Sequence, residues 1–519
     1  MDTKALRQKI LDLAIRGKLV PQDPNDEPAE VLLERIREQK QQMFKEGKLK
    51  KKDIKNDTII FKGEDNLHYE KFADGTVKCM EDEIPFEVPE GWAWCKLNDI
   101  YNFIDYRGAT PTKITNGIPL VTAKNVKSGY IDYTIDDYIS EEEFKERQQR
   151  GISKKGDILF TTEAPLGNAA LADMEKFSAG QRLITFQQYG SKNELINYVM
   201  LMFILSDFFQ QQLYVNKTGS TVAGIKAAIL KTLWIPVPPY NEQLRISNTL
   251  KSAINLIDSI SKNKEILSTS ISNTKSKILD LAIRGKIVPQ DPNDEPASVL
   301  LERIRAEKEE LIKQGKIKRD KKESVIFKGD DNSYYEKVGN NVNCIDEKIS
   351  FELPEGWAFI RLNTAWELIS GRDLSPSEYN DKNDGIPYIT GASNFRNGHI
   401  SLVRWTTVPQ VITRRGDLLL TCKGTIGEIA HNNFGEAHIA RQIMAIRNIY
   451  SLNVDFLALC IEYSMTKIKQ AANGLIPGIS REDILNLVIP IPPTKEQENI
   501  CNKLKATFSA IEHIEKSLN

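Results

Sequence analysis

The chain has 519 residues, 40% of them hydrophobic, which is enough for two domains of ordinary size with separate cores. Its formal net charge of −1 argues against a protein that binds nucleic acid of any sequence through charge alone. The six cysteines include no Cys-x-x-Cys pair, so neither a disulfide framework nor a zinc site is indicated.

The N-terminal segment, residues 2–16, is amphipathic and charged, and it lacks the apolar core of a secretory signal peptide. The most apolar window, residues 198–209, is too short to span a bilayer. We expect this window to form a buried helix in the first half of the chain, with residues 454–465 as its counterpart in the second half. The sequence therefore predicts a cytoplasmic protein.

An internal repeat organises the chain. Residues 9–40 recur almost unchanged as residues 277–308. The pairs that differ are Leu19/Ile287, Glu30/Ser298, Glu38/Ala306 and Gln39/Glu307. The spacing between the copies is far too long for a solenoid, whose units run to roughly 20 to 50 residues. The repeat instead indicates two large, related halves.

Further matching segments follow in the same order in both halves. Residues 86–92 match residues 351–357, and residues 235–239 match residues 489–493. Between these segments, the two halves match only at scattered glycines and in short strand-like runs. Two explanations stay open. Identical segments can face two copies of one partner while divergent segments recognise two different targets, or the duplication is recent and still diverging.

Residues 240–284 connect the halves and carry apolar residues in the 4-3 rhythm of a coiled-coil seam. Residues 494–518 repeat the first part of this seam, and residues 2–16 repeat the second part. The predicted seam residues are Ile246, Leu250, Ile257, Leu267, Ile271, Ile278, Leu281, Ile500, Leu504 and Ile511. We predict that the long helices lie antiparallel, with one globular half at either end, and that the central helix is about 60 to 65 Å long.

The interior of each half shows a mixed pattern. β-Branched runs such as residues 119–122 and 158–162 are typical of strands. A buried helix and a glycine-containing loop follow them. We therefore predict an α/β (α+β) fold class, with two globular domains related by a pseudo-two-fold axis.

The segment after each copy of the repeat has a helix and a basic run. Residues 28–44 and 296–312 are predicted to form amphipathic helices. The basic runs at residues 45–55 and 313–322 leave two interpretations open, a solvated hairpin or a surface that contacts phosphate or a partner.

Motifs for catalysis are weak. The Val-Pro-Pro-Tyr sequence at residues 237–240 resembles the Asn/Asp-Pro-Pro-Tyr loop of amino-methyltransferases. A valine stands where that chemistry needs an Asn or Asp, so we interpret the motif as a strand exit into a helix. No glycine-rich nucleotide loop is present, and the histidines have no metal-ligand spacing. Asp157 and Glu163 could serve as nuclease carboxylates, but the second half has Asp417 and Lys423 instead, which favours a structural turn for the aspartates.

Together the two Gly-Trp segments, the Ile-Pro-x-Pro-Pro exits followed by Glu-Gln, and the long spacer helices carry a family resemblance. The chain resembles the specificity subunits of type I restriction-modification systems over nearly its full length. The lysine-rich extensions with Phe-Lys-Gly at residues 61–63 and 327–329 lie outside the minimal family pattern, and their role stays open.

The resemblance implies a DNA-recognition subunit without catalytic activity of its own. Each of two target recognition domains would read one half of a bipartite double-stranded DNA site, and the helices would set the gap between the half-sites. Two methyltransferase subunits would dock on the repeated helices, and motor-nuclease subunits would join for restriction. S-adenosylmethionine, ATP and Mg²⁺ are expected on these partners, and no cofactor is expected on this chain.

The resulting domain boundaries follow the repeats. We expect an N-terminal helix (1–17), a repeat extension (18–88), target recognition domain 1 (89–239), a central spacer helix (240–285), a second extension (286–353), target recognition domain 2 (354–493) and a C-terminal helix (494–519).

Base-reading residues are sought among Arg, Lys, Asn, Gln, Ser and Thr in the divergent parts, because these side chains match the donors and acceptors on base edges. The first domain offers Arg107, Lys124, Asn125, Thr162, Arg182, Lys217 and Ser220, and the second offers Arg372, Ser393, Asn394, Arg396, Lys423, Arg441, Gln442 and Arg481. The alternative function is a coiled-coil adaptor whose two domains bind other proteins.

Overall fold

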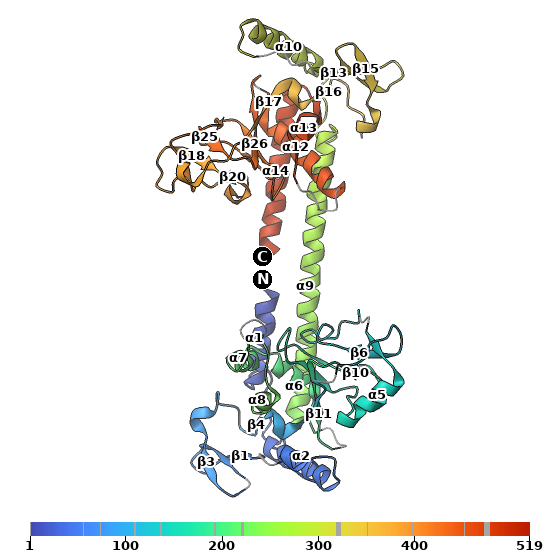
Figure 1. The fold of residues 1–519 in the computed structure, drawn as a ribbon, viewed down its shortest axis with the longest axis vertical. Coiled ribbons are helices and arrows are strands. Elements are labelled where there is room, and N and C mark those ends of the chain that lie inside the picture. The colour runs from blue at the N-terminus through green and yellow to red at the C-terminus, as the bar shows by residue number, and fades with distance from the viewer. Residues whose placement is uncertain are drawn as a thin grey trace. The chain divides into compact units, whose positions relative to one another are not determined.

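The structure, a computed structural model, describes residues 2–54, 57–72, 74–107, 110–134, 137–190, 194–219, 223–317, 323–349, 351–396, 398–450, 452–471 and 478–518. The chain divides into two compact units, residues 1–264 and 265–519. Each unit contains both helices and strands (Figure 1), which confirms the predicted fold class and the division into two halves. The finer segment boundaries given above stay predictions.

The main elements of the first unit are α1 (Thr3–Ile15), α2 (Ala29–Lys45), α3 (Lys51–Ile54), β1 (Ile59–Lys62), β2 (His68–Lys71), β3 (Val77–Cys79), β4 (Ala93–Lys96), α4 (Leu97–Ile100), β5 (Tyr101–Asp105), β6 (Ile118–Val121), β7 (Tyr138–Ile139), α5 (Glu141–Arg147), β8 (Ile158–Thr161), β9 (Ala169–Leu171), β10 (Ser178–Ala179), β11 (Leu183–Gln188), α6 (Asn197–Ile204), α7 (Asp207–Val215), α8 (Ala227–Leu230), β12 (Trp234–Val237) and the start of α9 (Tyr240–Ile283).

A four-stranded antiparallel sheet, in the order β5-β11-β8-β9, forms the centre of the first unit. Successive residues of a strand point to opposite faces, and both faces of this sheet are covered. Ile158 and Phe160 of β8 pack into a core shared with α6, whereas Leu159 packs into a second core with β6 and β10. Two-sided burial explains why β8 reads as a continuous apolar run rather than an alternating one.

The sequence patterns at the edges of the first unit are confirmed in part. The apolar window at residues 198–209 was predicted to be one buried helix, but it divides between two: α6 (Asn197–Ile204) is buried, and α7 begins after its N-cap Ser206. Strand β12 pairs with β4 and leads through Pro238 and Pro239 directly into α9. The Val-Pro-Pro-Tyr motif is therefore a strand exit into a helix, as predicted.

The second unit contains α10 (Ala297–Lys313), β13 (Ser324–Lys328), β14 (Tyr334–Val338), β15 (Asn341–Cys344), β16 (Ala358–Arg361), α11 (Leu362–Ala365), β17 (Trp366–Ser370), β18 (Ile386–Ile389), β19 (Phe395–Arg396), β20 (His399–Ile400), β21 (Trp405–Thr406), β22 (Ile412–Thr413), β23 (Leu418–Thr421), β24 (Ile429–His431), β25 (Ala437–Ile439), β26 (Ile443–Asn448), α12 (Val454–Ala471), α13 (Arg481–Leu485), β27 (Val488–Ile491) and α14 (Thr494–Leu518).

The central sheet of the second unit, in the order β17-β26-β23-β24, repeats the arrangement of the first. Leu418 and Leu420 of β23 face the core that contains α12, and Leu419 faces a separate core with β25. Strand β27 pairs with β16 and leads into α14, as β12 leads into α9. The two units thus share one structural frame although their intervening sequences have diverged.

Helix α9 takes part in both units, and within each unit a terminal helix lies antiparallel to it. In the first unit Arg7 of α1 forms an ion pair with Asp258, and Asp2 lies within electrostatic range of Lys264. In the second unit Lys275 of α9 forms an ion pair with Glu515 of α14, with 2.7 Å between Nζ and Oε2. In the first unit the later residue of α1 therefore pairs with the earlier residue of α9. In the second unit Glu496, at the start of α14, accepts a hydrogen bond from Gln290, which follows α9, so α14 also runs antiparallel to α9.

The predicted seam is only partly buried. Ile246, Leu250, Ile257, Ile271, Ile500 and Leu504 are buried, and Ile278, Leu281 and Ile511 are half-buried. Leu267 is 39% exposed, so its assignment to the seam is wrong in this structure. Leu279, Ala282 and Ile283 are buried instead near the end of α9, because the helix there packs into the globular core of the second unit rather than against one helix.

Each repeat extension ends in a small antiparallel sheet, β1-β2-β3 in the first unit and β13-β14-β15 in the second. The first basic run, residues 45–55, does not form this hairpin. Its described residues form the turn after α2 and the short helix α3, and β1 begins only at Ile59. In the second run, residues 318–322 lie outside the described residues.

Candidate nucleic-acid interface

Several sequence-predicted residues of the first unit meet at one end of the central sheet. Because β5 and β8 run antiparallel to β11, the residues after β5 and β8 lie beside the residue before β11. Arg107, Glu163 and Arg182 occupy these positions. The Thr162 N–H donates to the Arg182 carbonyl at 3.0 Å, and Arg182 Nε lies 3.2 Å from Glu163 Oε1. We call this exposed region the first strand-end surface.

A glycine-containing loop packs against the first strand-end surface. Thr218 and Gly224 exchange two backbone hydrogen bonds of 2.8 and 3.0 Å, and the Ile225 N–H donates to the Thr162 carbonyl at 3.0 Å. Lys217 is exposed on this loop, with Nζ 3.6 Å from the centre of the Tyr214 ring. Ser220, also predicted to bind DNA, lies outside the described residues.

Arg107 is held in place by its neighbour in the chain. Its guanidinium donates to both carboxylate oxygens of Asp105, at distances from 2.6 to 3.0 Å. Burial raises the pKa of Asp105, but the hydrogen bonds from Arg107 outweigh it and the pKa lies below its ordinary value. These contacts orient Arg107 at the strand end and leave 32% of its side chain exposed.

The second unit has the same frame with different side chains. The Cys422 N–H donates to the Gln442 carbonyl at 2.8 Å, and the Ile479 N–H donates to the Cys422 carbonyl at 2.9 Å. Lys423 and Gln442 therefore correspond to Glu163 and Arg182. Arg372 follows β17 as Arg107 follows β5. Arg372, Lys423 and Gln442 are exposed and, with Arg441, form the second strand-end surface.

Other predicted residues lie near this end of the second sheet. Arg441 is 67% exposed and contacts Asp373, with 2.7 Å between Nε and Oδ2. Arg481 donates to the Leu368 carbonyl and to the Ser370 hydroxyl, the latter at 3.3 Å. Arg481 is thus tied to the backbone of β17, which makes it a support for the surface.

The turns after β6 and β18 contain most of the remaining predicted residues. Lys124 and Ser393 are exposed in these turns, and Arg396 is exposed in β19, which follows the second turn; all three stay candidates for DNA contact. Asn125 and Asn394 are 6% and 1% exposed. Asn125 accepts from the Thr122 N–H and donates to the Asp132 carbonyl, and Asn394 makes the corresponding bonds in the second unit.

These bonds correct the prediction for both asparagines: their side chains hold a turn and are unavailable to base edges. Thr162 needs the same correction, because it is 1% exposed and its hydroxyl donates to the Arg182 carbonyl at 3.2 Å. An asparagine or threonine that closes its own turn is identical in sequence to one that reads a base.

Glu163 is not among the DNA-contact residues predicted from the sequence, although the structure places it on the first strand-end surface beside Arg182. The signal that could have found it is the change of charge at one aligned position, Glu163 in the first half and Lys423 in the second. His438 is another supporting residue. Its Nε2 lies 2.8 Å from the Arg372 carbonyl, and its Nδ1 accepts from the Val411 N–H at 3.1 Å. Burial lowers the pKa of His438, which favours the neutral ring.

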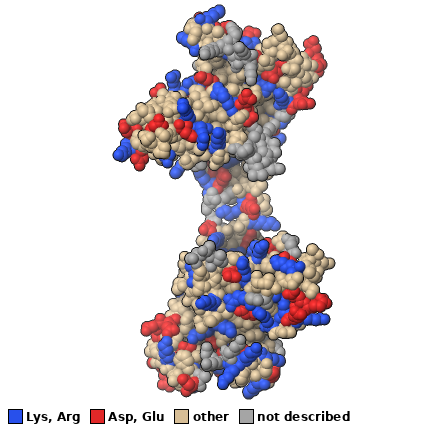
Figure 2. Space-filling model, in the orientation of Figure 1, with Lys and Arg blue, Asp and Glu red and all other residues tan. Residues whose placement is uncertain are grey.

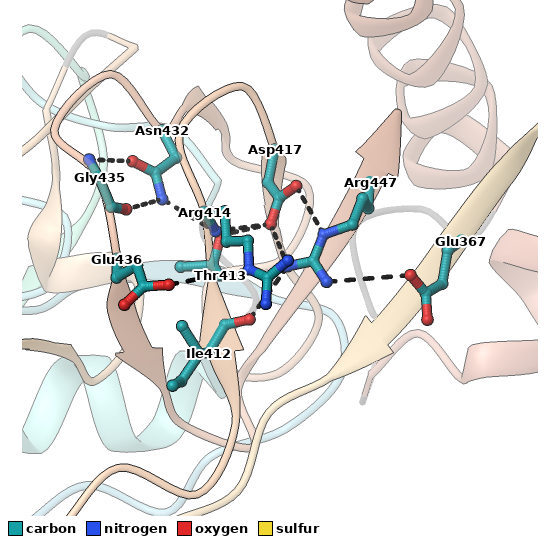
Figure 3. Close-up of polar contacts among 9 residues, drawn as sticks. All are labelled: Glu367, Ile412, Thr413, Arg414, Asp417, Asn432, Gly435, Glu436 and Arg447. Carbon is teal, nitrogen blue, oxygen red and sulfur yellow. Dashed lines mark hydrogen bonds and ion pairs between the residues drawn. The ribbon is translucent and has the colours of Figure 1, made fainter. Parts of the chain in front are cut away.

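The two strand-starting aspartates are structural, as predicted. Figure 3 shows Asp417 bound by Arg447, with distances of 2.9 and 3.1 Å, and by the Thr413 hydroxyl at 2.9 Å. In the first unit the equivalent Asp157 accepts from Gln187 Nε2 at 2.8 Å, and burial raises the pKa of Asp157 to about 6. Both aspartates lie at the start of the strand, away from its exit.

On the face shown in Figure 2, charged residues of both signs are exposed. In the view of Figure 2, basic and acidic side chains are interspersed over both units. Among the described residues, no cluster of three or more His, Cys, Asp or Glu side chains could hold a metal ion. In the same part of the chain, no helix is long and apolar enough to cross a membrane.

Comparison with known proteins identifies the family. A family model described as the type I restriction modification DNA specificity domain matches residues 89–268 and 354–519. The chain belongs to this family. The resemblance seen in the sequence is thereby confirmed, and the two matched regions fall one in each half.

Individual relatives match almost the full chain. The EcoAI specificity subunit of Escherichia coli is 27% identical, and the match covers 97% of this chain and 90% of that protein. The EcoEI specificity subunit of Escherichia coli is 26% identical, with 99% and 90% covered. A solved chain from a type I R-M system shares 19% identity at a TM-score of 0.57, covers 84% of this chain and 94% of the other, and supports the fold.

Proposed function

We propose that this chain is the DNA specificity subunit of a type I restriction-modification enzyme, and that each strand-end surface reads one half of a bipartite site. The observation that carries the proposal is the contrast between frame and surface. Backbone hydrogen bonds at Thr162 and Ile225 recur at Cys422 and Ile479, whereas the exposed side chains on the same frame differ. A shared frame with different exposed side chains suits two domains that bind the same polymer at different sequences.

The duplicated segments are proposed to bind two copies of one methyltransferase subunit. Trp92 donates from Nε1 to Glu242 at 2.9 Å in the first unit, and Trp357 donates to Glu496 at 2.9 Å in the second. The Ala29 N–H donates to the Gly91 carbonyl at 2.8 Å, and the bond from Ala297 to Gly356 has the same length. Matching internal contacts hold the repeated segments in the same conformation in both units, so each unit can offer a similar surface to one copy of the same partner.

Catalysis is assigned to the partners. S-adenosylmethionine would bind the methyltransferase subunits, and ATP and Mg²⁺ would bind motor-nuclease subunits when these are present. The present chain supplies recognition, and its neutral net charge fits a subunit whose partners contribute part of the phosphate neutralisation.

Helix α9 is proposed to set the spacing of the half-sites. Its 44 residues would extend about 66 Å at the usual rise of an α-helix. Half-sites one turn of DNA apart are about 34 to 36 Å from centre to centre. The number of unread base pairs should then depend on the length of α9 and of the terminal helices that pack along it.

The test is to co-express this chain with the methyltransferase subunit encoded beside it, in a host that lacks both, and to map modified adenines by single-molecule sequencing. We expect one bipartite motif. The matched control is the methyltransferase subunit alone, which should modify no such motif. A stable complex that leaves the DNA unmodified, and that binds DNA without sequence preference, would contradict the proposal and favour the protein adaptor.

A further inference from the structure

One pair of equivalent positions on the two strand-end surfaces carries side chains of contrasting chemistry. Glu163 and Arg182 occupy the pair in the first unit, and Lys423 and Gln442 occupy it in the second. In both units the pair flanks the same backbone hydrogen bond, from Thr162 to Arg182 at 3.0 Å or from Cys422 to Gln442 at 2.8 Å. The position of these side chains is therefore fixed by the sheet, while their identity is not.

A carboxylate at this place needs an explanation. Glu163 lies beside Arg182. The hydrogen bonds that Arg107 donates to Asp105, and more weakly the negative charge of Glu163, raise the pKa of Arg107. Phosphate oxygens would repel Glu163. The DNA groups that a carboxylate can accept from are the exocyclic amines of cytosine and adenine in the major groove. A carboxylate among arginines on a DNA-facing surface therefore suits base contact and opposes backbone contact.

The neighbouring arginine narrows the choice of base pair. Arginine donates to the N7 and O6 acceptors of guanine, and Glu or Asp accepts from the N4 amine of cytosine. Glu163 and Arg182 approach within 3.2 Å and are 44% and 52% exposed, so they present an acceptor and a set of donors side by side. A G·C pair presents the complementary groups side by side in the major groove.

We propose that Glu163 and Arg182 together read one G·C base pair in the half-site of the first domain, with Arg182 on guanine and Glu163 on cytosine. This inference rests on the proposed function. The second unit carries a different pair at the same place. Lys423 offers only donors, and Gln442 offers the donor and acceptor that fit adenine N7 and N6. A Cβ atom on Gly391 would lie 2.2 Å from Gln442 Oε1, so this glycine leaves room for the glutamine side chain.

A surface ion pair without function is the simpler explanation. An exposed ion pair usually contributes little to stability, so exchanging its two residues should have little effect. Lys155 and Glu175 provide that case in the same unit, because both are exposed and Nζ lies 2.6 Å from Oε1. Their exchange is the matched control.

The experiment transplants the pair of the second unit into the first. The variant Glu163→Lys with Arg182→Gln is co-expressed with the methyltransferase subunit, and its modified motif is compared with that of the wild type. We expect the wild-type motif to contain an invariant G·C pair whose preference falls about 10-fold to 100-fold in the variant. The other half-site and the spacer should stay unchanged, and exchanging Lys155 with Glu175 should leave the whole motif unchanged.

The outcomes separate this inference from the proposed function. An unchanged motif in the double variant refutes the inference while the proposed function stands. A wild-type complex with no bipartite motif refutes the proposed function itself. If the double variant is not produced as a stable complex, Arg182→Lys and the reciprocal variant Lys423→Glu with Gln442→Arg decide. The inference is supported if Arg182→Lys weakens selection at one G·C pair, or if the reciprocal variant creates a new G·C preference in the other half-site. If neither effect is observed, the inference is refuted.

Discussion

Replacing Gln187 by arginine should remove a pH-dependent loss of stability from the first unit. Asp157 is 7% exposed and accepts from the Lys154 N–H and from Gln187 Nε2, each at 2.8 Å. No cation is among these hydrogen-bond donors, and burial raises the pKa of Asp157 from 3.8 to about 6. In the second unit Arg447 takes the place of Gln187, and Arg447 binds the Ile412 carbonyl at 3.1 Å as Gln187 binds the Ile152 carbonyl at 3.1 Å.

The sign follows from proton binding. The folded state holds the proton of Asp157 more tightly than the unfolded state, so stability falls as pH rises from the unfolded pKa of 3.8 through the folded value of about 6. The whole loss is about 3 kcal/mol, and about half of it falls between pH 5 and pH 7.5. An arginine at residue 187 should lower the pKa of Asp157 and abolish this part of the pH dependence.

The assay is denaturant unfolding at pH 5 and pH 7.5, followed by hydrogen exchange in peptides that cover β8 and β11. The change in unfolding free energy between the two pH values is compared in wild type and Gln187→Arg, so that the contributions of other titrating groups cancel. The reciprocal variant Arg447→Gln should create the same pH dependence in β23 and β26. Equal pH dependence in wild type and Gln187→Arg would refute the assignment of this loss to Asp157.

Three further predictions concern the frame. Leu250→Ala should destabilise the chain by about 2 to 5 kcal/mol in denaturant unfolding, because Leu250 is buried. Leu267→Ala should cost less than about 0.5 kcal/mol, because Leu267 is exposed. Equal costs for the two variants would contradict the description of the seam. Trp92→Phe removes one hydrogen-bond donor from the buried carboxylate of Glu242 and should lower the free energy of unfolding by about 1 to 3 kcal/mol. A Tm equal to that of the wild type would contradict this prediction. Asn394→Ala opens the turn after β18 and should weaken methylation of all sites alike; a changed base preference would show that this side chain reads DNA.

The sequence predicted the frame better than the surface, for physical reasons. The repeats and the period of apolar residues reflect burial, so β8, α6 and α9 could be located from them. The seam prediction failed at Leu267, since periodicity describes one helix face and does not show where partner helices end. It also missed Leu279, which packs into a globular core rather than a seam.

The candidate site depended on long-range pairing that no local pattern contains. Residue type in the divergent parts of the sequence was enough to propose Arg107, Arg182 and Lys423. The sequence could not show that Asn125 binds its own turn, or that Glu163 lies beside Arg182 across two strands. Such neighbours become visible only when the register of β8 and β11 is known.

The buried bond between Trp92 and Glu242, repeated between Trp357 and Glu496, fastens each globular half to the first turn of a long helix. These anchors belong to the invariant part of the chain, and the strand-end surfaces lie at the exit of the central strands. Substitutions at those exits leave the anchor and the outer faces of the repeated segments intact. Under the proposed function, a substitution at one of these exits would change the target sequence of one half and leave the surfaces proposed to bind the partner subunits as they are.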